Sequence, residues 1–498
     1  MAASFRIYNT LSRSVEDFVP QVPGKVGIYV CGMTVYDRSH VGHARAMVVF
    51  DAFVRYLRHR SWDVLFVRNF TDVDDKIIRR ANELGEDPVG LASRFIDVFH
   101  EDMDALGLVR PDHEPRVSRC IDDIHDVIGK LVDKGHAYVS EGTVWYAVRT
   151  FDEYGKLSGQ NIDELRSPDE AGGKRDPADF ALWKCARPGE VSWESPWGPG
   201  RPGWHIECSA MGCKHLGATL DIHGGGLDLV FPHHENEIAQ SEAANGAQFA
   251  NYWMHNGLLT MAGGQKMGKS LGNVINIDVA LAEFPAEALR LYYLQNKYRS
   301  PLPWSGDALP EALGMLSRLY DAREAAEAMG GEGDADRIAK EMGKTASDVL
   351  RLGRDFEARF HGALDEDFNT GGAIGAAFEL ARAVNRFADH KKARKRGGPI
   401  VAPALGAFAL LADGLGLLGR PVSEFHAEVK VKRLKALGLD EAAVEGMLAE
   451  RSAARAAKDW ARSDALRDEL EGSGIIVMDK PEGVQWRVRC VAPDSATA

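Results

Sequence analysis

The chain has 498 residues and a formal net charge of -13 at pH 7, and 45% of its residues are hydrophobic. A chain of this length exceeds what one hydrophobic core can organise, so several globular domains are expected. The acidic balance argues against a protein that coats nucleic acid indiscriminately, although a local basic face such as 391–396 or 430–435 could still attract RNA.

Two further features bear on the compartment. No apolar run approaches the length of a membrane span, so we expect no contact with a membrane. The six cysteines are irregularly spaced, which argues against a disulfide framework and favours a reducing, cytoplasmic compartment. The first residues, MAASFRIYNTLSRS, weakly mimic a transit peptide, but FRIYNTLSRSVEDFVP alternates like a strand and is interpreted as mature sequence.

The N-terminal region predicts a βαβ unit. The segment GKVGIYVCG (24–32) is an apolar, β-branched strand, residues 41–60 repeat apolar side chains at helical spacing, and residues 64–67 form the next strand. Such a unit implies a parallel sheet that binds its ligand at the carboxyl ends of its strands. The dinucleotide fingerprint GxGxxG is absent from the first turn, which argues against a nicotinamide or flavin enzyme.

The later segments differ in composition. Residues 108–203 are irregular and rich in Pro and Gly, and they predict an insertion between two halves of the sheet, too short for a large editing module. Amphipathic helices are expected at 309–328, 339–364 and 370–392, broken at MGGEGDAD and at RGGPIVAP. From Pro421 the pattern is helical to about Gly472 and then strand-like at 475–478.

The predicted fold class is therefore α/β. It comprises a Rossmann-like parallel-sheet catalytic domain with an insertion, a helical bundle and a small mixed C-terminal domain. The expected boundaries are 1–110 and 201–260 for the two halves of the catalytic domain, 111–200 for the connective insertion, 261–308 for a loop-bearing junction, 309–400 for the bundle and 421–498 for the C-terminal domain.

His40 and His43 are three residues apart at the predicted start of a helix, directly after the first strand. Both imidazoles can then face one side, beside the first backbone NH groups of the helix and the positive end of its dipole. This arrangement suits the phosphates of ATP. On spacing alone, two histidines on a helix surface are the simpler interpretation.

The segment GGQKMGKS (263–270) satisfies the P-loop expression GxxxxGK[ST]. A P-loop requires a helix to begin at GKS, so that its first amides bind phosphate. Here LGNVINI follows, in which Gly-Asn and the β-branched residues disfavour a helix, and the next plausible N-cap is Asp278. We therefore reject the P-loop interpretation.

Cys31, Cys208, His233 and Glu237 form a candidate metal site. Cys31 follows the first strand, and His233 and Glu237 are four residues apart, so they project together on a helix. All four residue types are competent zinc ligands, but no CxxC pair makes the site local. The other cysteines are expected to be small buried hydrophobes: Cys120, Cys185, Cys213 and Cys490.

The segment DIHGGGLD (221–228) predicts a strand that ends in glycines. Gly225 and Gly226 would let the backbone approach adenine closely, and Asp228 could accept hydrogen bonds from ribose hydroxyls. A simple glycine turn is the alternative.

Together these segments resemble one family. SHVGH (39–43) and KMGKS (266–270) are similar to the two ATP-handling signatures of class I aminoacyl-tRNA synthetases. CGMTVYD (31–37), WHIEC (204–208) and FPHHENE (231–237) resemble the cysteinyl-tRNA synthetase family, and the resemblance runs from the first strand to the last few residues. The family's usual serine between Met and Lys is Gly268 here.

The resemblance implies a ligase that activates L-cysteine with ATP and Mg²⁺ to cysteinyl-adenylate and transfers it to the terminal 2′-hydroxyl of tRNA(Cys). It implies a mobile lysine loop, with Lys266 and Lys269 closing on the triphosphate beside His40 and His43, and a tRNA-binding bundle. It implies one Zn²⁺ per chain, which takes the thiolate of the substrate. We expect a monomer.

The implied site residues fall into five overlapping groups. The residues implied for catalysis are His40, His43, Lys266 and Lys269, and those implied for ATP binding are His40, His43, Gly225, Gly226, Asp228 and Lys269. Cysteine would be bound by Cys31, Thr71 and Trp204, and zinc by Cys31, Cys208, His233 and Glu237. The residues implied for the anticodon are Arg455, Trp460, Asp464, Asp479 and Trp486.

Two alternatives stay open. A relative on the same catalytic fold joins cysteine to an amino sugar, but it needs no anticodon-reading tail, and such a tail is present here. A noncatalytic, zinc-bearing RNA-binding module would leave both ATP signatures unexplained.

Overall fold

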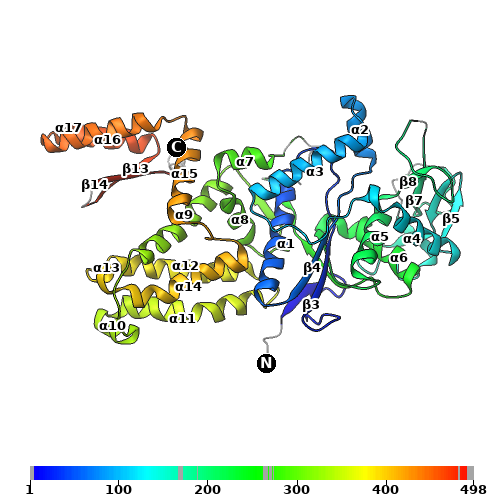
Figure 1. The fold of residues 1–498 in the computed structure, drawn as a ribbon, viewed down its shortest axis with the longest axis horizontal. Coiled ribbons are helices and arrows are strands. Elements are labelled where there is room, and N and C mark those ends of the chain that lie inside the picture. Colours follow the sequence, from blue (N-terminus) through cyan, green and yellow to red (C-terminus); the bar gives the residue numbers. More distant parts are fainter. Residues whose placement is uncertain are drawn as a thin grey trace.

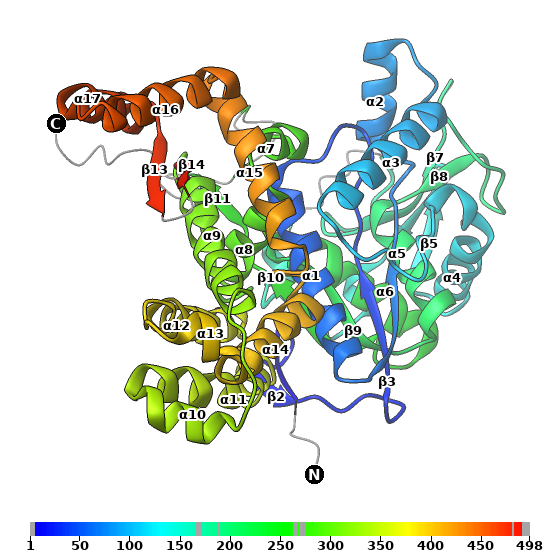
Figure 2. The same cartoon turned by 60° about the vertical axis from the view of Figure 1, so that its left-hand side comes forward.

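The computed structural model describes residues 5–165, 172–187, 189–261, 267, 272, 274–480 and 483–490. A parallel four-stranded sheet forms its centre, in the order β10-β9-β3-β4. Figure 1 labels β3 and β4 side by side, and Figure 2 labels β9 and β10. Its strands are β3 (Lys25–Val30), β4 (Asp63–Arg68), β9 (Leu220–Gly226) and β10 (Ala250–Asn256). Two strands come from each half of the catalytic region; β3, β4 and β9 were predicted, whereas β10 was not.

The sheet separates two hydrophobic cores. Ile28 and Phe66 belong to the core that includes α1, whereas Tyr29 and Val67, one residue further along the same strands, belong to the core on the other face. This alternation follows from the two-residue period of a strand, and burial on both faces is typical of parallel sheets. The remaining elements of this region are β1 (Arg6–Asn9), β2 (Ser14–Asp17), α1 (Val41–His59), α2 (Asp75–Leu84), α3 (Pro88–Ala105), α5 (Trp204–Leu216) and α6 (Glu235–Asn245).

The insertion is more regular than predicted. It contains α4 (Ile121–Asp133) and an antiparallel sheet of β5 (Ala137–Ser140), β6 (Thr143–Tyr146), β7 (Phe180–Cys185) and β8 (Gly200–Pro202). The strands are rich in aromatic and β-branched residues, and Trp145 and Trp183 are fully buried, which outweighs the Pro- and Gly-rich connections. The expected boundary at 200/201 falls within β8.

A junction connects the sheet to a helical bundle. It consists of β11 (Leu259–Met261), α7 (Ile277–Glu283), α8 (Ala286–Leu294) and β12 (Leu302–Trp304). The bundle consists of α9 (Ala308–Glu327), α10 (Ala335–Met342), α11 (Lys344–Leu364), α12 (Thr370–Ala388), α13 (Ala393–Arg396) and α14 (Gly398–Leu415).

Two predictions for the bundle were wrong. The single helix expected at 339–364 is divided at Gly343, whose φ of 89° ends α10 before α11 begins. The break expected at RGGPIVAP is short, because α14 starts at Gly398 and contains the rest of that segment. Pro399 lies in its first turn, where a missing NH costs no helical hydrogen bond. The bundle therefore extends past residue 400.

The helix α14 is long and apolar enough to cross a membrane by length and composition, contrary to the expectation for the sequence. In the structure, Ile400, Phe408 and Leu411 on this helix are fully or almost fully buried. Gly353 of α11 packs against Pro403, so α14 is a core helix of the bundle.

The C-terminal region begins with α15 (Val422–Leu437), which packs against α7 and α9 (Figure 2). It continues with α16 (Glu441–Ala456), α17 (Trp460–Gly472), β13 (Ile475–Lys480) and β14 (Gly483–Val488), which share a small core. The helical-then-strand pattern was predicted. The basic stretch 430–435 is largely paired, because Lys430 contacts Glu441 and Lys432 contacts Glu428.

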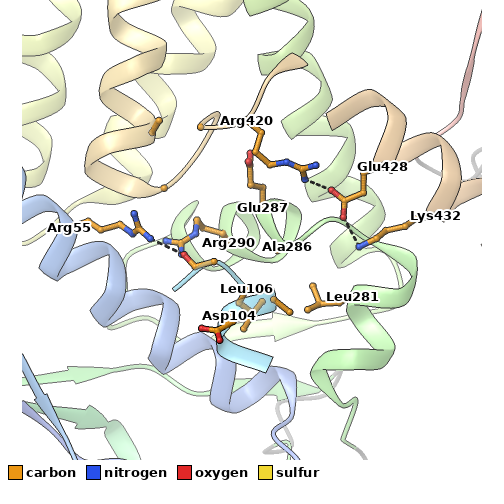
Figure 3. A pocket seen from close by; sticks show the side chains of 15 residues that line it. Arg55, Asp104, Leu106, Leu281, Ala286, Glu287, Arg290, Arg420, Glu428 and Lys432 are labelled. Atoms are coloured by element: carbon orange, nitrogen blue, oxygen red, sulfur yellow. Dashed lines mark hydrogen bonds and ion pairs between the residues drawn. The ribbon is translucent and has the colours of Figure 1, made fainter. Parts of the chain in front are cut away.

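A buried ion pair holds α1 to α8. Arg290 Nη1 lies 2.6 Å from Asp51 Oδ2, and both side chains are 3% exposed. Figure 3 shows Arg290 beside a cavity of about 410 Å³ where α1, α8, α15 and the end of α14 meet. Glu428 on α15 contacts both Arg420 and Lys432 across this junction, so charged side chains from several elements meet there.

We expect Asp51→Asn to lower the free energy of unfolding of the catalytic region by about 3 kcal/mol, because it leaves the Arg290 guanidinium buried without its carboxylate. Urea denaturation would measure the change. Asp336→Asn is the matched control, since Asp336 pairs with Arg354 at the surface and should leave the transition unchanged. Equal stability of both variants would contradict the role of this pair.

Candidate active site and metal centre

Four residues from distant parts of the chain meet next to the C-terminal end of β3. Cys31 Sγ lies 3.6 Å from Cys208 Sγ and 3.5 Å from Glu237 Oε1, and His233 Nε2 lies 3.0 Å from the same carboxylate oxygen. All four side chains are buried, and their donor atoms lie within 4.8 Å of one another. The structure thus brings together the residues that the sequence analysis selected for zinc.

The backbone explains why His233 and Glu237 converge. Phe231 is extended (φ -139°, ψ 135°), as residues before proline prefer, and the helical turns begin again at Pro232. His233 therefore lies in the turn before α6 and Glu237 in its first turn, one helical turn apart. Cys208 projects from α5, which packs against α6.

Further histidines surround this cluster. His223 Nε2 lies 2.8 Å from Glu237 Oε2, His205 Nδ1 lies 2.9 Å from His233 Nδ1, and His234 Nδ1 lies 2.8 Å from His255 Nε2. Cys31, His223, His234 and Glu237 form a second possible ligand set. Sequence reasoning missed His223 and His234, although both lie in the motifs that it quoted.

Burial sets the protonation of this region. It lowers the pKa of His233 and His234 well below the usual value and that of His255 to about 3, so these imidazoles are neutral. Burial also raises the pKa of the Cys31 thiol well above its usual value and raises that of Cys208. A bound cation would reverse this effect on the thiols, since metal ligation favours thiolate.

Trp204 and Thr71 both contact the surroundings of the cluster. The indole of Trp204 stacks on His233, with ring centroids 4.3 Å apart and planes at 21°, and Trp204 remains 38% exposed. Thr71 Oγ1 donates to Glu207 Oε2 at 2.9 Å, and Glu207 is adjacent to Cys208. Helix α5 therefore connects both residues to the metal cluster, and Glu207 is a contact that sequence reasoning missed.

His40 and His43 lie together at the start of α1, as expected. His40 is the N-cap, its Nδ1 accepts from the backbone NH of Gly42 at 3.0 Å, and its ring stacks on His43 with centroids 3.5 Å apart. Met267 is buried and approaches Gly42, so this residue contacts the histidine motif. Lys266, Gly268 and Lys269 lie outside the described residues.

The glycines at the end of β9 have packing roles. A Cβ on Gly224 would lie 2.4 Å from the Phe50 ring, and one on Gly225 would lie 2.9 Å from Leu229 and 3.0 Å from His234. These glycines are thus required inside the fold, whether or not a nucleotide approaches them. Asp228 follows in a 3-10 turn, beside Gly226.

The anticodon candidates all lie in the C-terminal region, though not in one cluster of contacts. Asp479 Oδ2 accepts from Arg455 at 2.5 Å, and hydrogen bonds from Arg451 and Arg455 lower the pKa of Asp479 to about 2. Trp486 donates to Glu445 instead and lies under Lys430, beside a cavity of about 990 Å³. Trp460 and Asp464 lie on α17, where Trp460 is 57% exposed.

One cysteine prediction was wrong. Among the remaining cysteines Cys120 is buried, but Cys185 is exposed because it is the last residue of β7, and Cys213 and Cys490 are half-buried. All six thiols are free.

Comparison with known families gives three matches. Residues 17–314 match the class I (C) tRNA synthetase catalytic domain, residues 359–418 match the DALR domain, and residues 440–487 match the cysteinyl-tRNA ligase anticodon binding domain. Together they cover the sheet, the later helices of the bundle and the C-terminal region.

Comparison with curated proteins gives long matches. A protein of Anaeromyxobacter dehalogenans (strain 2CP-C) named cysteine–tRNA ligase is 51% identical over 498 residues, which cover 97% of this chain and 100% of the relative. One of the same name from Solidesulfovibrio magneticus is 48% identical over 492 residues, with coverages of 97% and 100%.

Solved structures share the fold at low identity. A Mycobacterium tuberculosis methionyl-tRNA synthetase in complex with methionyl-adenylate has a TM-score of 0.61 at 16% identity and covers 84% of this chain and 94% of its own. An Agrobacterium radiobacter K84 LeuRS in a ternary complex with tRNA has a TM-score of 0.58 at 12% identity, with coverages of 83% and 86%.

We expect Gly224→Ala to destabilise the protein by about 1–3 kcal/mol, because its Cβ would overpack against the buried Phe50 ring. Gly129→Ala is the control, since Gly129 lies inside α4 with no atom within 4 Å of the new Cβ and should be neutral or stabilising. Thermal unfolding measures both. A wild-type melting temperature for Gly224→Ala would rule out the packing role.

Proposed function

The chain belongs to the cysteine–tRNA ligase family of class I aminoacyl-tRNA synthetases, and on that premise we propose which of its residues carry out the reaction. The cysteine carboxylate attacks the α-phosphate of ATP, giving cysteinyl-adenylate and pyrophosphate. The terminal 2′-hydroxyl of tRNA(Cys) then attacks the carbonyl carbon of the adenylate, and AMP leaves. The observation that carries the assignment of residues is the buried cluster of two thiols, an imidazole and a carboxylate.

We assign one Zn²⁺ per chain to Cys31, Cys208, His233 and Glu237. Thiolate and imidazole are preferred zinc ligands, and the described donor atoms lie close enough to share one ion. When bound, zinc would stabilise the thiolate of substrate cysteine, whereas it would interact much more weakly with the harder hydroxyl oxygen of serine.

Glu237 is the ligand best able to yield its place to a substrate. Four protein ligands would make a closed structural site, whereas substrate binding needs an open position. The second oxygen of Glu237 lies 2.8 Å from His223 Nε2, so the carboxylate has another buried partner. Selection against serine at such a site could make editing unnecessary, which agrees with the short insertion.

We likewise assign the remaining residues that would bind cysteine and ATP. Trp204 and Thr71 would border the amino-acid pocket, since Trp204 stacks on the proposed ligand His233 and Thr71 donates to Glu207, which is adjacent to Cys208. His40 and His43 at the start of α1, with Lys266 and Lys269, would bind and stabilise the phosphates together with Mg²⁺. Gly225, Gly226 and Asp228 would contact the nucleoside. Positioning and charge stabilisation dominate such a reaction, so no protein nucleophile is required.

The tRNA would bind along the bundle and the C-terminal region. Arg455, Trp460, Asp464, Asp479 and Trp486 are the proposed anticodon contacts. The exposed ring of Trp460 is available for stacking on a base. Six free thiols suit a cytoplasmic location, and we propose a monomer.

The purified protein should contain about one zinc ion per chain by elemental analysis. Cys208→Ala should lose most of this metal and raise the KM for cysteine at least about tenfold. Mutation of residues that merely orient metal ligands already has effects of this size, and Cys208 is proposed as a ligand itself. Cys120→Ala is the matched control, because Cys120 is also buried but lies outside the cluster. Full activity in metal-free protein would disprove the zinc assignment.

Ligation of cysteine to an amino sugar is the second candidate, because it could use the same catalytic fold. Truncation after Gly438 removes α16 to β14 and keeps α15, which packs on α7 and α9. We expect the truncated chain to retain cysteine-dependent pyrophosphate exchange but to lose at least about tenfold in tRNA charging, the effect of about 1.4 kcal/mol of lost binding. Undiminished charging would show that α16 to β14 do not contribute to tRNA binding, whereas a full-length chain that exchanges pyrophosphate but charges no tRNA would favour the second candidate.

A further inference from the structure

Glu235 is a buried carboxylate between two proposed zinc ligands in the sequence. It is 0% exposed, yet its partners belong to the insertion. Oε1 accepts from the backbone NH groups of Gly155 at 3.0 Å and Leu157 at 3.4 Å, and Oε2 accepts from that of Ser158 at 2.7 Å. In the described part of the chain no ion pair involves this carboxylate, so backbone amides compensate for its burial.

The loop 151–160, here called the clamp loop, has the conformation needed to present these amides. Gly155 and Gly159 have φ values of 98° and 74°, and a Cβ on Gly155 would lie 2.4 Å from the carbonyl oxygen of Gln160. Glycine is therefore required at residue 155. Successive NH groups of such a turn form a concave site for an anion, here filled by Glu235 of the same chain.

The insertion holds α6 at other points too. Tyr154 of the clamp loop donates to Asn236 Oδ1, Lys156 Nζ lies 2.6 Å from Glu242 Oε2, and Tyr146 on β6 donates to the carbonyl oxygen of Ala239 at 2.9 Å. These contacts extend over the first two turns of α6.

On its other side α6 is bound to α5, because Gln240 Nε2 donates to His205 O and Ser209 Oγ. Local structure alone does not fix the start of α6. Phe231 interrupts the helical backbone, and no side chain caps the first turn. The orientation of this turn therefore depends on the elements that contact it. The clamp loop is one of them, because its backbone NH groups donate to the Glu235 carboxylate.

We propose that the clamp loop positions the zinc site through Glu235, which fixes the turn carrying His233 and Glu237 relative to Cys31 and Cys208. Glu235 is a positioning residue and touches neither metal nor substrate. The inference rests on the zinc site proposed above. It gives the insertion a function in this protein, since retention of the metal then depends on the insertion being folded against α6.

The test is the dissociation constant of Zn²⁺, measured by competition with a chromogenic chelator, with melting temperatures of the metal-free proteins alongside. Glu235→Ala should weaken zinc binding at least about tenfold, the lower end of the effect of groups that orient metal ligands. Glu235→Gln should fall between it and wild type, because an amide oxygen still accepts from the clamp loop. Tyr154→Phe, which removes one neutral contact, should weaken binding less than Glu235→Ala.

Tyr138→Phe is the control for a general loss of stability. It removes a buried hydrogen bond to Asp179 elsewhere in the insertion and should keep wild-type zinc affinity even if its melting temperature falls. Wild-type affinity in a folded Glu235→Ala variant would overturn the proposal, as would an equal loss in Tyr138→Phe. If Glu235→Ala does not fold, wild-type zinc affinity in both Glu235→Gln and Tyr154→Phe would overturn the proposal instead. A wild-type chain that takes up no zinc would instead disprove the metal site itself.

Discussion

The cluster of Cys31, Cys208, His233 and Glu237 is the constraint on which the catalytic region depends. Thiols, an imidazole and a carboxylate are packed within 4.8 Å in a buried place, where burial alone opposes ionisation of the thiols. A bound cation would offset that cost, because it favours the deprotonated ligands and couples their assembly to folding. The end of β3, the start of α5 and the turn before α6 must all be placed correctly for one ion to bind them.

Each supporting element can be understood from this requirement. The parallel sheet places the end of β3 beside β9, whose His223 contacts Glu237. The insertion binds α6 on one side and Gln240 joins it to α5 on the other. The histidine motif of His40 and His43 is joined to the same frame through α1. Arg45, fully buried on that helix, donates to the carbonyl oxygens of Leu258 and Tyr298 and so links α1 to the segments that precede β11 and β12.

The sequence predicted the sheet, the helical start at His40 and the grouping of Cys31, Cys208, His233 and Glu237, because strand period, helix spacing and family motifs are local signals. It missed contacts that exist only after folding. Nothing local indicates that Glu235 meets an insertion loop 80 residues earlier, or that His223 faces Glu237. The division at Gly343 was missed because the predicted helix was continued through this glycine, which has a positive φ in the structure. The continuation of α14 through Pro403 was missed because the glycines and prolines of RGGPIVAP were treated as a break regardless of their position in the helix. The roles of Lys266 and Lys269 stay predictions.

The most direct test replaces zinc with Co²⁺ and records the visible absorption spectrum of the protein with and without substrates. If the buried cluster holds an ion that takes the substrate thiolate, cysteine should add a sulfur-to-cobalt charge-transfer band and shift the d–d bands, whereas serine at the same concentration should leave the spectrum unchanged. A spectrum that cysteine does not alter at saturating concentration, in protein that still forms cysteinyl-adenylate, would show that the substrate thiol does not bind the ion and would contradict the account.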